Sequence, residues 1–195
     1  MISGGLPDNR NPLKNTLIIR DKVVEEGPQL PFAVYQHCQV EVKDSVFVLG
    51  GRDKDWTFIK SVQILKDRVW SLGAAMSTAR YQHTCIEFKD LIYVVGGKTE
   101  DSSGLLTVDI YDPQTDTWNT GPSLTEPVVD GQLVYYHNQL YLLGGTENTK
   151  VFTLSADPDA KWEAVSGVSI EAEERKFFPA PVVSINMLYC ANEDE

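Results

Sequence analysis

Short apolar runs alternate with polar turn segments along the whole chain, and three of these runs end at a pair of glycines. The three runs cover residues 46–49, 91–95 and 140–143. Val, Ile, Tyr and Phe are frequent in such runs because their side chains fit the pleated, half-buried surface of a sheet. An aromatic residue stands three places before the first glycine each time, as Phe47, Tyr93 and Tyr141. The pattern predicts β-strands that each end at a glycine pair.

The glycine pairs recur at nearly constant spacing. They begin at residues 4, 50, 96 and 144, so the intervals are 46, 46 and 48 residues. A tryptophan follows each of the last three pairs, after a second β-rich run, and starts a further short strand that ends in a turn. The repeated frame residues are Gly50, Gly51, Gly96, Gly97, Gly144, Gly145, Trp70, Trp118 and Trp162. Four strands of about four to eight residues fill each period, which indicates one supersecondary unit used repeatedly.

A single four-stranded sheet cannot bury both of its faces, so the units must stack. A tryptophan at one place in each repeat can pack between neighbouring sheets. Glycine at a strand end permits backbone angles closed to other residues and a close approach of neighbouring backbone. The repeats therefore predict an all-β scaffold.

Composition and charge narrow the classes of function. Hydrophobic residues make up 42% of the chain, which is enough for a folded core. No apolar run approaches the roughly 18 residues of a membrane span. The formal net charge of −11 opposes binding to nucleic acid and to anionic membranes. We therefore expect neither a membrane nor a nucleic acid as partner.

The cysteines are few and odd in number: Cys38, Cys85 and Cys190. Such a set is more typical of reduced thiols than of a disulfide framework. All three lie in apolar strand contexts, so we expect buried core thiols, with a reactive sensor as the alternative. Reduced thiols favour a cytoplasmic protein, with a cytoskeletal or nuclear location as alternatives.

Two stretches, residues 108–118 and 76–83, resemble the most typical parts of kelch repeats, and the resemblance covers nearly the whole chain. It extends to the kelch-like proteins of the BTB-kelch type. Kelch repeats imply a β-propeller in which each repeat is one four-stranded blade around a central channel.

Aligned to the glycine pairs, the chain divides into about four blade equivalents, three whole blades and two half-blades. We expect a partial blade over 4–32, whole blades over 33–78, 79–126 and 127–170, and a second partial blade over 171–195. This division into whole blades and half-blades favours a partial kelch domain from a larger protein. The alternatives are a small ring closed by pairing of the half-blades and association of two chains through open blade edges.

The sequence offers little catalytic chemistry. His37 and His83 stand at matched positions, each 13 residues before a glycine pair. They could share a metal only if the propeller axis brought them together, and a hydrogen-bonded repeat position is the simpler interpretation. No paired Cys or His has ligand spacing, and no nucleophile elbow or phosphate loop occurs. We therefore predict a protein that is not an enzyme and needs no metal or cofactor.

Binding through loops is the remaining interpretation. The segments after the glycine pairs differ in sequence while the strands repeat, and loops on rigid scaffolds carry function. Trp56 lies outside the repeat position, and beside Arg52 it could anchor a partner. Packing of Trp56 onto its own blade is the alternative.

The family resemblance suggests further contact residues. In kelch proteins that resemble ubiquitin-ligase adaptors, arginines and tyrosines at the blade openings contact the recruited partner. The matching positions here are Arg80 and Tyr81, and Arg175 falls near the equivalent place in the last repeat. An arginine that locks its blade is the other interpretation of Arg80.

The resemblance implies a protein–protein interaction scaffold. One form is the substrate receptor of a cullin-type ubiquitin ligase, whose partner is a ubiquitination substrate. The alternative is a kelch protein that binds actin or another cytoskeletal protein, and a propeller enzyme is a weaker one.

Overall fold

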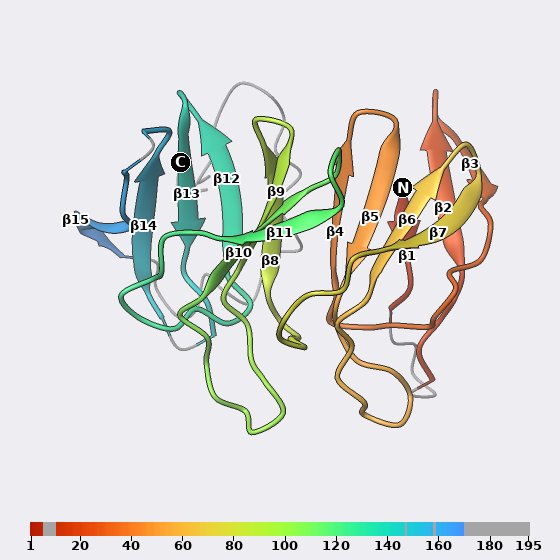
Figure 1. Ribbon diagram of the computed structural model, residues 1–195, viewed down its shortest axis with the longest axis horizontal. Helices are drawn as coiled ribbons and strands as arrows, with labels where there is room; N and C mark the ends of the chain where they lie inside the picture. Colours follow the sequence, from red (N-terminus) through yellow and green to blue (C-terminus); the bar gives the residue numbers. More distant parts are fainter. Residues whose placement is uncertain (6–10, 147, 158, 170–195) are drawn as a thin grey trace, which may run out of the picture.

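The computed structural model describes residues 1–5, 11–146, 148–157 and 159–169. Within them the chain forms one three-stranded and three four-stranded antiparallel sheets, all simple meanders. The sheets stand side by side as blades of a partial β-propeller (Figure 1). The partial blade expected over 171–195 lies outside the described residues. Within the described part, no helix is long and apolar enough to cross a bilayer.

We name the sheets blades A to D in chain order. Blade A contains β1 (Ile2–Ser3), β2 (Thr16–Arg20) and β3 (Val23–Glu26). Blade B contains β4 (Cys38–Val42), β5 (Ser45–Leu49), β6 (Val62–Lys66) and β7 (Val69–Gly73). Blade C contains β8 (Thr84–Phe88), β9 (Leu91–Val95), β10 (Val108–Asp112) and β11 (Thr117–Thr120). Blade D contains β12 (Gln132–Tyr136), β13 (Gln139–Leu143), β14 (Lys150–Ser155) and β15 (Glu163–Ser169).

The strands that the apolar runs predict are confirmed, because β5, β9 and β13 each end directly before a glycine pair. Blade A has one strand more than the two outer strands that the sequence indicates. Its short β1 pairs with β2 through Ile2 opposite Leu17 and Ser3 opposite Thr16. The glycine pair in blade A therefore directly follows β1, which takes the place that β5, β9 and β13 have in the other blades.

The hydrophobic cores lie between blades, as stacking of the sheets requires. One cluster joins blade C to blade D around Leu142 and Phe152, and a second joins blade B to blade C around Phe47 and Tyr111. A smaller cluster around Leu30 joins the segment between blades A and B to blade B. The sheets thus bury apolar side chains where successive blades meet, as expected for stacked repeats.

The glycine pairs hold successive blades at close range. Gly50 and Gly51 both have positive φ, 62° and 91°. A Cβ on Gly50 would lie 2.8 Å from the Arg80 carbonyl oxygen, so any larger residue would push the next blade away. The N–H of Gly51 donates to that same carbonyl at 2.9 Å. Glycine is needed here both for its backbone angles and for its missing side chain.

The repeated tryptophans fasten each outer strand to the blade before it. Trp70 donates its indole N–H to the Pro28 carbonyl at 2.7 Å, and Trp118 donates to the Ala74 carbonyl at 2.8 Å. Trp162 lies directly before β15 and is buried in the cluster between blades C and D. Each of the three tryptophans thus lies in or against one of the hydrophobic clusters.

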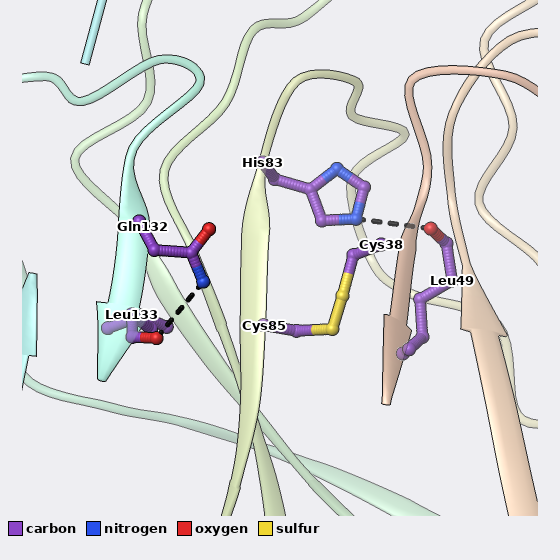
Figure 2. Close-up of a disulfide and its surroundings, with 6 residues drawn as sticks. All are labelled: Cys38, Leu49, His83, Cys85, Gln132 and Leu133. Carbon is purple, nitrogen blue, oxygen red and sulfur yellow. Dashed lines mark hydrogen bonds between the residues drawn. A yellow bond between two sulfur atoms is a disulfide. The ribbon is translucent and has the colours of Figure 1, made fainter. Parts of the chain in front are cut away.

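The cysteines differ from the sequence-based expectation. Cys38 on β4 and Cys85 on β8 form a disulfide between neighbouring blades, with Cα atoms 5.9 Å apart (Figure 2). The expectation of reduced thiols is therefore wrong for this pair, and Cys190 lies outside the described residues. Blade stacking sets the two innermost strands side by side, and this proximity is invisible in the sequence. The disulfide also removes the support that reduced thiols gave to a cytoplasmic location.

Candidate functional site

The meander of each blade places its connections at two ends. The first and third connections lie at one end. The second connection and the segment leading to the next blade lie at the other end, which we call the loop face. The long β5–β6 and β9–β10 loops project from the loop face at the bottom of Figure 1.

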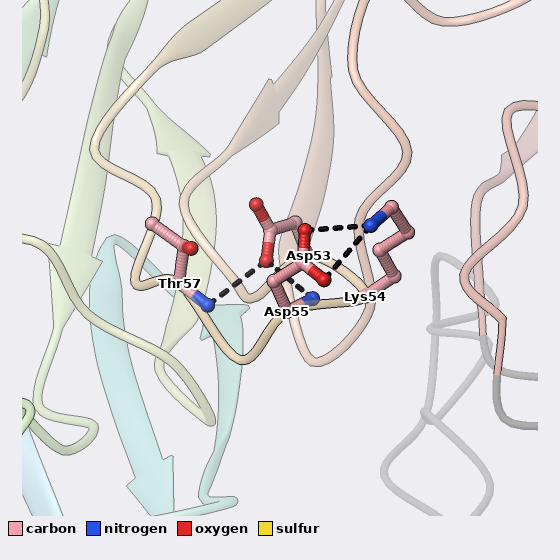
Figure 3. Close-up of polar contacts among 4 residues, drawn as sticks. All are labelled: Asp53, Lys54, Asp55 and Thr57. Carbon is pink, nitrogen blue, oxygen red and sulfur yellow. Dashed lines mark hydrogen bonds and ion pairs between the residues drawn. The ribbon is translucent and has the colours of Figure 1, made fainter.

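The β5–β6 loop is held by its own aspartate. The Asp53 carboxylate accepts hydrogen bonds from the N–H groups of Asp55 and Thr57, both at 2.9 Å (Figure 3). The Asp53 N–H donates to the Thr57 carbonyl at 3.1 Å, and the Trp56 N–H donates to the Asp53 carbonyl at 3.2 Å. This closed loop fixes Trp56 with a φ of 62°, which is rare for a bulky residue.

The β9–β10 loop has the same backbone frame. Thr99 N–H donates to the Ser103 carbonyl at 3.2 Å, and Ser102 N–H donates to the Thr99 carbonyl at 2.9 Å. Ser102 also has a φ of 62°, so it stands where Trp56 stands in the preceding blade. Asp101 stabilises the loop by accepting from the Ser103 N–H at 3.0 Å. These hydrogen bonds hold the pKa of Asp101 below its ordinary value, with the Thr99 hydroxyl as the largest cause. Two loops of one shape therefore present different side chains.

An arginine surrounded by aromatic rings lies under the β5–β6 loop. The Arg52 guanidinium carbon is 3.4 Å from the ring centre of Tyr81. It lies 5.0 Å from the ring centre of Phe58 and 5.3 Å from that of Trp56. Tyr35 meets Trp56 edge to face, with ring centres 6.1 Å apart. Cation–π attraction and ring packing thus make one cluster from blade B and the start of blade C.

The cluster brings together three residues that the sequence indicates as partner contacts: Arg52, Trp56 and Tyr81. Trp56 is 60% exposed although its ring edge contacts Tyr35, so it both packs on its own blade and presents an indole surface. Tyr81 is only 4% exposed and acts as the floor beneath Arg52. Trp56 is therefore the member of the three that a partner can reach most easily.

Arg80 does not belong to this surface. Its side chain is fully buried, forms an ion pair with Asp109, and donates to the Gly96 carbonyl at 3.2 Å and the Thr107 hydroxyl at 3.2 Å. This placement corresponds to the blade-locking interpretation of Arg80, because a buried guanidinium does not meet a partner. Arg175 lies outside the described residues.

The matched histidines contact the preceding blades. The His83 ring nitrogen Nε2 lies 3.1 Å from the Leu49 carbonyl oxygen (Figure 2), and the backbone of Ser3 accepts the corresponding bond from His37. Burial lowers the pKa of His37 to about 4 and that of His83 to about 3. In the described part of the chain, no group of three or more His, Cys, Asp or Glu side chains could hold a metal ion.

Phe58, Tyr35 and Phe32 are not among the contact residues that the sequence predicts. Tyr35 carries a signal that could have identified it, because it repeats Tyr81 in the matched Tyr-Gln-His stretches. Phe58 and Phe32 lie in segments that differ between repeats, so only the folded loops bring them to the loop face.

Residues 79–125 match the protein-family model described as the Kelch motif. The matched segment contains all four strands of blade C. No curated protein matches the chain.

Proposed function

The chain carries a Kelch motif within the four-stranded blades of a partial kelch-repeat propeller, and we propose that it binds a protein partner through its loop face, with Trp56 as the central anchor. A Kelch motif of this kind supports a protein-interaction scaffold. The observation that carries the proposal is the indole of Trp56, 60% exposed at a positive φ on a loop closed by Asp53.

Strain at an exposed residue supports a functional role. A bulky residue in the left-handed region costs on the order of 1–3 kcal/mol and persists only where its surroundings hold it. The matched loop of blade C has Ser102 at the same angle, so the frame itself does not require an aromatic ring. Exposed tryptophans are enriched among the residues that dominate binding energy at protein interfaces.

A matched substitution tests the anchor. Trp56→Ser places the residue of the blade C loop on the same frame, so we expect the melting temperature to stay nearly unchanged. Binding of proteins captured from a cell extract, identified by mass spectrometry and then titrated singly, should weaken by roughly 30-fold or more. Tyr136→Ser is the control, because it removes a 45% exposed aromatic ring from the turn at the opposite end. Equal affinity of wild type and Trp56→Ser would refute the proposal.

The kind of protein partner is a separate part of the proposal. As substrate receptor of a cullin-type ubiquitin ligase, the protein would present a ubiquitination substrate on the loop face. The captured proteins should then include such substrates. The second candidate is a cytoskeletal partner, and co-sedimentation with actin filaments tests it, since failure to pellet removes it. A cytoplasmic location and a role without enzymatic activity are further parts of the proposal. A stoichiometric transition metal in the purified protein would contradict the absence of enzymatic activity.

A further inference from the structure

A groove on the loop face lies between blades B and C. Its walls come from the β5–β6 loop, the segment that joins the two blades, and the β9–β10 loop. Asp55, Trp56, Phe58 and Glu100 are among the residues that line it, and its volume is about 610 Å³. A smaller groove of about 300 Å³ occupies the matching place between blades A and B, with Phe32 in its wall and Asp55 shared between the two. The larger one, which we call the B–C groove, is large enough for several side chains of a peptide.

One wall of the B–C groove is aromatic and rigid. Trp56 and Phe58 both line it, and both rings contact the Arg52 guanidinium. Phe58 also packs on Tyr81 with ring centres 5.5 Å apart. An aromatic wall fixed in this way loses little conformational entropy when a partner binds, so it suits an apolar side chain.

The charged groups that line the B–C groove are all acidic. Asp55 and Glu100 lie in its lining, and none of the described lysines or arginines does. The nearby charge of Arg52 is directed onto the ring of Tyr81. Lys54 pairs with Asp55 across 2.7 Å, but both side chains are about two-thirds exposed, at 66% and 67%. An exposed pair of this kind contributes little, so a cation from a partner can replace Lys54.

The two lining carboxylates are not required by the loop frames. Asp53 and Asp101 accept the backbone hydrogen bonds that close the two loops. Among the hydrogen bonds of the described residues, the Asp55 carboxylate accepts from Lys54, and Glu100 lines the groove from the second loop. The carboxylates that line the B–C groove can therefore be neutralised while the loops keep their shape.

We propose that the B–C groove selects a peptide segment of the partner in which a lysine or arginine stands beside an aromatic or branched aliphatic residue. This inference rests on the proposed function and specifies its partner. The apolar side chain packs against Trp56 and Phe58, and the cation lies near Asp55 and Glu100. The chain's net charge of −11 attracts such a segment at long range and repels an acidic one.

Selection from a library of random peptides displayed on phage tests this inference. We expect wild-type protein to enrich peptides with a net positive charge and a basic residue next to an apolar one. The recovered peptides are then synthesised, and their dissociation constants are measured by fluorescence anisotropy for each variant. Enrichment of neutral or acidic peptides, or of none, overturns the inference.

The double variant Asp55→Asn, Glu100→Gln removes the two lining charges and keeps the size of the side chains. We expect it to raise the dissociation constants about fivefold at low salt, with a difference that shrinks near 1 M salt. The matched control is Asp159→Asn, Glu163→Gln, which removes two exposed charges outside the loop face and should leave the constants unchanged. Equal constants for wild type and the groove variant overturn the inference.

The same peptides separate the two proposals. If Trp56→Ser weakens peptide binding and the groove charge variant does not, the loop-face function stands and the charge selection fails. If neither variant changes peptide binding and Trp56→Ser also keeps its captured proteins, both proposals fail. Thermal unfolding of each variant shows whether it is folded, so a loss of binding is not mistaken for a loss of structure.

Discussion

At the scale of single residues, His37 and His83 show how one repeated position stabilises two blade contacts. Each ring bonds to the backbone of the preceding blade, to Ser3 and Leu49 respectively. Among the described residues, Nδ1 of each ring has no hydrogen-bond partner. A protonated imidazole would therefore be poorly solvated at either place. Burial is the largest cause of the lowered pKa values, and the Arg80 charge lowers that of His83 further.

These lowered pKa values predict a loss of stability in mild acid. The pKa of each histidine falls from its ordinary 6.5 to about 4 in His37 and about 3 in His83. Between pH 6.5 and 4 these two histidines therefore bind more protons in the unfolded chain than in the folded chain. The full stabilisation is present above pH 6.5 and decreases as the pH falls, by up to about 1.4 kcal/mol per pH unit for each histidine. Urea unfolding at several pH values measures this slope.

Substitution of the histidines gives the control. His83→Gln should lower the stability at pH 7 and reduce the slope between pH 6.5 and 4, because one titrating group is removed. His137→Gln, at an exposed turn position, is the matched substitution outside the contacts between blades. A slope that His83→Gln does not alter would show that other groups cause the acid sensitivity.

At the scale of strands and their connections, a buried ion pair fixes the segment before β8 to β10. Arg80 pairs with Asp109, whose side chain is 14% exposed. The carbonyls of Val34, Arg80 and Val128 accept the same bond from successive glycine pairs, so these three residues are equivalent. The position of Asp109 is taken by Gln63 in blade B and by Phe152 in blade D, and both residues are buried. The same contact is therefore made by a charged pair in blade C and by uncharged residues in blades B and D.

A double-mutant cycle tests the pair. Arg80→Val leaves Asp109 without its cation and should lower the free energy of unfolding by about 3–5 kcal/mol. Arg80→Val combined with Asp109→Phe installs the combination found in blade D, so we expect the double variant to lose much less than the sum of the two single variants. Denaturant unfolding measures all three. Strictly additive losses would show that Arg80 and Asp109 act independently.

At the scale of the whole molecule, one face of blade A differs from the matching faces of blades B and C. Ile19 on β2 is 50% exposed, whereas Leu65 is 7% exposed and Tyr111 is fully buried at the equivalent places. The matching ring of Tyr111 packs against Phe47 of the preceding blade. Leu17, on the same face as Ile19, is 38% exposed. This face therefore carries apolar side chains at positions that are buried in blades B and C.

We predict self-association through this face at high protein concentration. Light scattering should show a mass that rises with concentration, more strongly at high salt, because salt screens the net charge of −11. Replacement of both Leu17 and Ile19 by lysine should keep the protein monomeric. Val69→Lys, at a 67% exposed position of β7, should have no such effect. A wild-type mass that stays monomeric at all concentrations would contradict the prediction.

Much of the fold could be predicted from the sequence, and less of the candidate site. The glycine pairs located β5, β9 and β13 correctly, and the repeated tryptophans located the outer strands. Trp56 could be predicted because it lies outside the repeat position, and Arg52 because it stands beside Trp56 in a loop that differs between repeats. Phe58 and the groove beside it were missed, since a loop without repetition carries no pattern that shows which side chains it presents.

The sequence by itself determined the period, the strands and the places where backbones come close. These follow from local chemistry, because alternating apolar residues form strands and glycine is needed wherever φ is positive at a crowded position. Only the tertiary structure decided that Cys38 bonds Cys85, that Arg80 is buried with Asp109, and that Arg52 lies over Tyr81. These contacts join neighbouring blades, or segments of one blade that are far apart in the sequence. Their partners depend on how the sheets stack, which no local pattern of residues specifies.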